Sequence, residues 1–195
     1  PYTSYIREAI RLRYRLLPYL YGLFYESTQL GTPIVRPMFY EFPKLIELFD
    51  LENQYMFGES LLVNPIVYKD QDIQKTILPF NDELIRWYLY DRNQTFEEIQ
   101  NDFKSTNEVL INHELKQPIG LEWPPMYIKG GTILIEATRD RRSASLTIYD
   151  PIKLIIALNS NQESKGYIYK DDGIKMNPSF VKGDFEFKTN RLDYN

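Results

Sequence analysis

The sequence of 195 residues contains no cysteine, one histidine and no long apolar run. The absence of cysteine excludes disulfide bonds, thiolate nucleophiles, iron–sulfur clusters and cysteine-based zinc sites. Because His113 is the one imidazole, multi-histidine metal sites are excluded as well. We therefore expect no metal and no other cofactor. No apolar stretch approaches the roughly 18–20 residues that span a bilayer, so we expect no membrane span.

Excess positive charge is also lacking. Lys and Arg number 23 against 27 Asp and Glu, which gives a net charge of −4. A chain with this balance has no basic field for the phosphates of nucleic acid, and we expect no nucleic-acid partner. The first residues, Pro1 to Ser4, contain no initiator methionine and no signal-peptide pattern, and are typical of a sequence that starts within a longer protein.

Aromatic residues, by contrast, are abundant. The chain has 16 Tyr, 11 Phe and 2 Trp, and 43% of its residues are hydrophobic. This composition supports a packed core and argues against disorder. The length suits one large domain or one and a half small ones.

The first thirty residues have helical periodicity. Ser4 can cap a helix that runs to residue 30, and Gly31 can end it. Pro18 lies inside the pattern and lacks the N–H that a helix needs, so we expect a kink or a split there. One apolar stripe follows the helical spacing: Ile6, Ile10, Tyr14, Leu17, Tyr21 and Phe24.

An apolar run from Ile34 to Tyr40 follows this helix. We expect a parallel strand buried on both faces, as in an α/β barrel, with Pro37 at its end. Arg36 within this run needs either a cleft or a partner, because an unpaired buried charge is costly. A structural ion pair with an acidic residue of a neighbouring element is the slightly favoured interpretation.

From residue 61 onward, short strand candidates alternate with turn residues, which predicts antiparallel β-sandwich structure. The predicted fold class is therefore α/β plus all-β. We expect residues 1–60 to close a barrel and residues 61–150 to form a first sandwich domain with a long polar insertion at 91–120. Residues 151–195 would begin a second, distal β-domain. The strand candidates lie at 61–67, 76–79, 85–88, 126–128, 132–135, 153–158 and 167–169.

Paired carboxylates are the first candidates for chemistry. Asp171 and Asp172 precede Gly173, and this pattern favours a turn over a catalytic or calcium-binding role. Asp70 and Asp72 lack the later residues of a calcium loop, so they are interpreted as solvated charges. His113 lies in the polar insertion and is interpreted as a surface side chain.

Two further patterns also have structural interpretations. Gly130-Gly131 lacks the helix and the lysine of a phosphate-binding loop, and suits a tight turn. A group of rings on the first helix can form a sugar platform, but at helical spacing core packing is favoured. These rings are Tyr14, Tyr19, Tyr21, Phe24 and Tyr25. We therefore assign no catalytic, cofactor-binding or metal-binding residue.

Several short sequence motifs are nevertheless specific. Together, and in their order along the chain, they resemble the C-terminal part of glycoside hydrolase family 31, the α-glucosidases. Residues 139–143 and 149–152 are most similar to the α-subunit branch of glucosidase II. One departure is Lys129, where the family often has arginine before the paired glycines. The blocks that carry the resemblance lie at 13–21, 31–39, 54–66, 125–133 and 169–173.

The resemblance implies a retaining hydrolase in which one carboxylate attacks the anomeric carbon and another acts as acid and base. In the family both carboxylates come from earlier barrel strands, in motifs that this sequence lacks. We therefore expect the 195-residue chain alone to be inactive. The resemblance also implies a glucosylated glycan substrate, N-glycan trimming in the lumen of the endoplasmic reticulum and a regulatory β subunit as partner. The alternative is a non-enzymatic β-sandwich module that binds carbohydrate or a partner subunit.

Overall fold

The computed structural model describes residues 2–69, 71, 73–79, 85–90, 113–118, 124–175, 178–188 and 191–194. Two compact units share the chain: Pro1–Ile34 with Gly131–Asn195, and Val35–Gly130. The expected domain boundaries near residues 60 and 150 stay predictions. Most of the expected 91–120 insertion, together with Asp70 and Asp72, lies outside the described residues. The side chain of His113 also lies outside them, although its backbone begins a strand.

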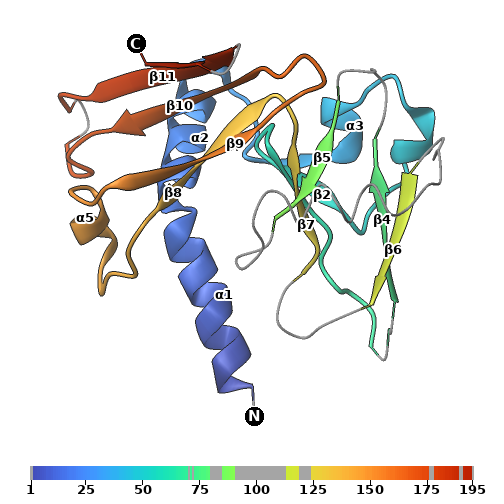
Figure 1. Cartoon of the computed structure of the whole chain (residues 1–195). Coiled ribbons are helices and arrows are strands. Elements are labelled where there is room, and N and C mark those ends of the chain that lie inside the picture. Colours follow the sequence, from blue (N-terminus) through green and yellow to red (C-terminus); the bar gives the residue numbers. More distant parts are fainter. Residues whose placement is uncertain are drawn as a thin grey trace. The chain divides into compact units, whose positions relative to one another are not determined.

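Two helices begin the first unit (Figure 1). Helix α1 spans Thr3–Arg15 and helix α2 spans Leu17–Leu30, so the expected split before Pro18 is confirmed. Pro18 lies in the first turn of α2. The N–H groups of a first turn have no acceptor within the helix, so the N–H that proline lacks is not needed there. Helix α2 ends at Gly31, whose φ of 70° is a left-handed conformation that glycine adopts at little cost.

The start of α1 and the face that it buries differ from expectation. The helix begins at Thr3 after Tyr2 without a side-chain cap, so the prediction that Ser4 caps it is wrong. Ile6 and Ile10 are 59% and 52% exposed, and no residue of α1 is buried. The part of the expected apolar stripe formed by Ile6 and Ile10 is therefore exposed, whereas Tyr14 at the end of α1 is partly buried.

A five-stranded sheet completes this unit, in the order β12-β11-β10-β8-β9. Its pairs are antiparallel except β8 with β10, which are parallel at Thr132 and Lys165. Strand candidates at 132–135, 153–158 and 167–169 are confirmed as parts of β8, β9 and β10, whereas β11 and β12 were not predicted. The bounds are β8 Thr132–Ala137, β9 Ile152–Ala157, β10 Ser164–Lys170, β11 Val181–Lys188 and β12 Arg191–Tyr194. Buried side chains on β8, β10 and β11 form its core: Ile133, Ile135, Ile168 and Phe185.

The second unit contains an antiparallel sheet of order β1-β2-β3-β7-β5 and a separate antiparallel pair, β4 with β6. The expectation of antiparallel β-structure is confirmed here. Two helical turns precede β2: α3, Met38–Glu41, and the 3-10 turn η1, Ile46–Leu48. The strands are β1 Val35–Pro37, β2 Tyr55–Phe57, β3 Leu61–Val63, β4 Ile73–Leu78, β5 Trp87–Leu89, β6 His113–Pro118 and β7 Met126–Lys129. Their shared core contains Met38, Phe42, Leu48, Met56, Leu62, Leu78, Trp87 and Tyr127.

Strand β1 corrects the expectation of a parallel strand buried on both faces. It has three residues, pairs antiparallel with β2 and lies at the edge of its sheet. Val35 and Pro37 are exposed, and Arg36 between them is buried. Pro37 ends the strand as expected, and an edge strand tolerates a residue that cannot donate to the ladder. The described residues thus form β-sheets with two N-terminal helices, and a (β/α)8 barrel is not evidenced among them.

None of the helices in the described residues is long and apolar enough to cross a membrane.

Candidate functional site

The Asp171-Asp172-Gly173 segment forms a turn after β10, as the sequence predicted. Asp171 Oδ1 accepts a hydrogen bond of 2.8 Å from the Gly173 N–H. Asp172 Oδ1 accepts bonds of 3.1 Å from the N–H groups of Ile174 and Lys175. Gly173 has a φ of 63°, a conformation that favours glycine. The pattern of two carboxylates before a glycine is therefore explained by turn geometry.

Helix α2 contacts this turn through Tyr21. The Tyr21 Oη donates to Asp171 Oδ1 at 2.5 Å, across 150 residues of sequence. This bond to Asp171 raises the pKa of Tyr21 to about 12, and partial burial adds to the effect. Burial alone would raise the pKa of Asp171, but the bonds from Tyr21, the Gly173 N–H and Tyr169 outweigh it and lower that pKa. Asp171 is consequently ionised at neutral pH.

Aromatic rings pack beside this hydrogen bond. Tyr25 of α2 stacks on Tyr169 of β10 with ring centroids 4.1 Å apart and planes 12° apart. Tyr21 lies 5.9 Å from the same ring, and Phe180 lies 5.3 Å from it. Tyr25 is partly buried by this stack, whereas Tyr21 and Phe24 on the same helix are 38% and 50% exposed, so the expected core packing does not hold for those two rings. These rings hold α2 against β10.

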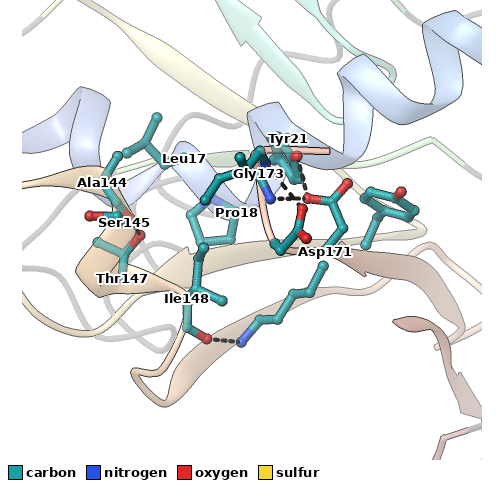
Figure 2. A pocket seen from close by; sticks show the side chains of 13 residues that line it. Leu17, Pro18, Tyr21, Ala144, Ser145, Thr147, Ile148, Asp171 and Gly173 are labelled. Atoms are coloured by element: carbon teal, nitrogen blue, oxygen red, sulfur yellow. Dashed lines mark hydrogen bonds between the residues drawn. The ribbon is translucent and has the colours of Figure 1, made fainter. Parts of the chain in front are cut away.

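A pocket of about 310 Å³ opens between α2, the short helix α5 (Ala144–Thr147) and this turn (Figure 2). Figure 2 shows residues from the three elements: Leu17, Pro18 and Tyr21 of α2, Ala144, Ser145 and Thr147 of α5, and Asp171 at the turn. The lining is Leu17, Pro18, Tyr21, Ala144, Ser145, Thr147, Ile148, Tyr169, Lys170, Asp171, Asp172, Gly173 and Ile174. All of these residues belong to the first compact unit.

An ion pair fixes the segment that carries α5. Arg141 Nε donates to Asp150 Oδ2 at 2.6 Å, and a second guanidinium nitrogen contacts Oδ1 in a bidentate arrangement. Arg139 adds a longer contact of 3.7 Å to the same carboxylate. The bond from Arg141 lowers the pKa of Asp150. Lys170 of β10 also donates to the Ile148 carbonyl at 3.1 Å, so both ends of α5 are anchored.

The two carboxylates at this turn do not have the properties of a glycosidase general acid. A glycosidase acid requires a raised pKa, whereas the pKa values of Asp171 and Asp172 are both lowered. No group of three or more potential metal ligands occurs within the described part of the chain. What the arrangement offers is apolar surface with hydrogen-bond acceptors at one edge, which is the chemistry of a binding site.

Arg36 lies in the second unit and has a structural role, as the favoured interpretation stated. Its guanidinium is 2.5 Å from Glu41 Oε1, and both side chains are largely buried. It also lies over the Tyr40 ring, 5.5 Å from the ring centroid. Lys129 Nζ is 3.8 Å from the other oxygen of Glu41. Lys129 therefore belongs to a cluster of charges that satisfies a buried carboxylate.

The sequence did not reveal the contact between Tyr21 and Asp171. Both residues were named as candidates, Tyr21 for packing and Asp171 for a turn, but nothing in their spacing joins positions 150 residues apart. The turn predicted at Gly130-Gly131 is confirmed. Gly131 has a φ of 91°, and its N–H donates to the Ala157 carbonyl where the chain enters β8.

Comparison with known proteins adds a family relationship. Residues 31–134 match the Glycosyl hydrolase family 31 C-terminal domain. The chain is 36% identical to the neutral alpha-glucosidase AB of Dictyostelium discoideum, over 100% of this chain and 19% of that protein. It is also 36% identical to the glucosidase 2 subunit alpha of Schizosaccharomyces pombe, over 95% of this chain and 18% of that protein.

Solved structures agree with the sequence relatives. A glucosidase II alpha subunit bound to alpha3-Glc2 superposes with a TM-score of 0.80 at 28% identity, over 100% of this chain and 20% of that one. An ER glucosidase II heterodimeric complex, of a catalytic subunit and the binding domain of a regulatory subunit, gives the same values. The chain spans about a fifth of the length of these relatives.

Proposed function

Because the chain belongs to glycoside hydrolase family 31, we propose that it is the C-terminal part of a retaining α-glucosidase. The whole enzyme would remove terminal α-linked glucose from glycans or oligosaccharides. The observation that carries this proposal is the match of residues 31–134 to the C-terminal domain of the family. The identity of 36% to relatives named as α-glucosidases supports the reaction.

Within this enzyme the 195 residues would serve as scaffold. Residues 1–60 would supply closing helical structure for a catalytic barrel whose strands lie elsewhere in the protein, and the strands after residue 60 would form the β-domains behind it. The carboxylate pair that performs the chemistry would lie elsewhere in the protein, because the motifs that carry it in the family do not occur in this sequence. The exposed apolar side chains of α1 support a barrel partner for that helix.

The glucosidase II relatives support a proposal for the substrate and its cellular context. We infer that the enzyme trims glucose from N-linked glycans in the lumen of the endoplasmic reticulum and acts with a regulatory β subunit. The support is the relative named glucosidase 2 subunit alpha and the heterodimeric complex among the structural neighbours.

The test is glucose release from a glucosylated N-glycan by the protein that the complete reading frame encodes. Mass spectrometry should show loss of hexose from an α-glucose-capped glycan and no loss from the same glycan without the cap. Release of hexose from the uncapped glycan alone would contradict the proposed specificity. Co-purification of a second subunit with the tagged protein tests the partner, and a protein that purifies alone and is fully active would reject it.

The alternative function is a β-sandwich module that binds carbohydrate or a partner without catalysis. The pocket beside Asp171 is the observation that favours keeping it. The two functions differ in their outcome for the 195-residue chain, which contains every residue of the pocket. Glycan binding by that chain, together with an inactive full-length protein, would favour the module.

A further inference from the structure

The pocket between α2, α5 and the turn at Asp171 has no part in the scaffold role described above. Its volume of about 310 Å³ lies at the lower end of the range for small-molecule sites, about 300–1,000 Å³. Such sites combine apolar walls with a few polar groups that fix orientation. A ligand of this pocket must therefore match both the apolar walls and the polar edge.

The walls of the pocket are apolar. Leu17 and Pro18 line it from α2, and Ile148 lines it from the segment after α5 (Figure 2). The rings of Tyr21 and Tyr169 add aromatic surface. A ligand that fits must therefore present an apolar face of its own.

The edge of the pocket presents acceptors. A carboxylate offers about four lone-pair positions. The structure gives Asp171 two donors, namely Tyr21 and the Gly173 N–H. Asp172 likewise receives the N–H groups of Ile174 and Lys175 and the Lys175 ammonium at 3.3 Å. Each carboxylate thus keeps acceptor capacity for an O–H donor of a ligand.

From these surfaces we propose that the pocket binds one pyranose unit of a neutral glycan. The sugar's hydroxyl groups donate to Asp171 and Asp172, and its C–H face lies against Pro18 and Tyr21. The ion pair between Asp172 and Lys175 reduces the negative charge at the edge, which favours a neutral ligand over a cationic one. The choice of a sugar rests on the proposed function, whose substrates are glycans. The site would hold a part of the glycan remote from the bond that is cleaved.

The experiment is titration of the 195-residue chain with maltose, followed by two-dimensional amide NMR. We expect saturable shifts at Gly173, Ile174 and Thr147, with a dissociation constant in the millimolar range that suits a small open pocket. The variant Ala144→Leu adds carbon to the pocket wall without touching either carboxylate, and should weaken binding by about tenfold or more. Its matched control is Ala9→Leu on the exposed surface of α1, which should bind as the unaltered chain does.

Circular dichroism establishes that both variants remain folded. Absence of saturable shifts, or equal binding by the two variants, would overturn the proposal. Stronger competition by the cationic ligand n-butylamine than by methyl α-glucoside would overturn it as well. Hydrolysis of an aryl α-glucoside by the full-length protein separates this inference from the proposed function. Maltose binding without hydrolysis would reject only the latter, and hydrolysis without binding at this pocket would reject only the former.

Discussion

The side-chain amide of Gln54 bonds both backbone groups of Ile77, as a residue of a neighbouring strand would. Its Nε2 donates to the Ile77 carbonyl at 2.7 Å, and its Oε1 accepts from the Ile77 N–H at 2.9 Å. Asn64 similarly donates to the Lys75 carbonyl at 2.8 Å. These amides connect β4 to the chain around β2 and β3, which pair in a different sheet. Because they are buried, losing one leaves backbone groups without partners.

The substitution Gln54→Ala should therefore lower the free energy of unfolding by about 1–3 kcal/mol, the cost of unsatisfied buried polar groups. Urea unfolding followed by tryptophan fluorescence measures the change. The control is Glu52→Ala, an exposed position two residues away, which should stay within about 0.5 kcal/mol of the unaltered chain. Equal losses in the two variants would show that the amide bonds contribute nothing specific.

Asp150 gives a prediction about pH. Its hydrogen bond and ion pair with Arg141 hold the pKa of Asp150 below the ordinary value of 3.8. The stabilisation is therefore complete above that value and is lost as the pH falls through the lower pKa of the folded protein. The stability difference between the unaltered chain and Asp150→Asn should shrink as the pH falls from 5 towards 2. Urea midpoints at each pH measure it, and a difference that grows on acidification would contradict the assignment.

Arg36 and Gln54 differ in how far the sequence predicts their environment. The charge of Arg36 within an apolar run required a partner, and the structure supplies Glu41. Gln54 carries no charge and lies outside any periodic pattern, so nothing signalled its burial. The pocket was equally invisible, because α2, α5 and the turn at Asp171 meet only in the folded chain.

At the scale of elements, α1 and α2 differ in how much they bury. No residue of α1 is buried, whereas α2 buries Gly22 and Leu23 and receives a hydrogen bond of 2.8 Å from Tyr167. Stability against local opening follows buried contacts. Amide hydrogen exchange should accordingly be faster along Thr3–Arg15 than along Leu17–Leu30. Equal protection of the two helices in exchange mass spectrometry would contradict this difference.

The close approach of β10 to β8 gives a second prediction for this scale. A Cβ at Gly166 would lie 2.5 Å from the Ile133 carbonyl oxygen, which is backbone and cannot move aside cheaply. Gly166→Ala should destabilise the chain by about 1–3 kcal/mol, as overpacked sites do. At Gly22 the nearest atom belongs to the Tyr167 ring at 3.1 Å, and alanine favours the helix by about 1 kcal/mol. Gly22→Ala should thus cost less, and a ranking in the opposite order by thermal unfolding would be evidence against the contact.

The elements that sequence predicted are those with continuous apolar runs. Strands β7, β8 and β9 have such runs, and Pro18 and Gly31 marked the helix boundaries. Strand β11 alternates charged residues with Phe185 and Phe187 and contains Gly183, which weakens a strand signal. Gly183 is needed because the Tyr194 ring lies where its side chain would be. Strand β1 was predicted with the wrong pairing, since its three residues cannot indicate whether the neighbour is parallel.

At the scale of the whole molecule, the chain spans about a fifth of its relatives' length, and we propose that the carboxylate pair of the reaction lies outside it. Among the described residues, Asp171 closes a turn, Arg36 and Glu41 form an ion pair, and the sheets bury apolar cores. The scarcity of histidine and the lack of cysteine are compatible with this role, because glycoside hydrolysis through two carboxylates needs neither.

Hydrolysis of an aryl α-glucoside tests the central claim most directly. The assay compares the purified 195-residue chain with the protein that the complete reading frame encodes, at equal molar concentration. The account predicts turnover by the complete protein, with the α-anomer of glucose formed first, and no turnover by the 195-residue chain. Measurable turnover by the 195-residue chain, or its absence from the complete protein, would contradict the account.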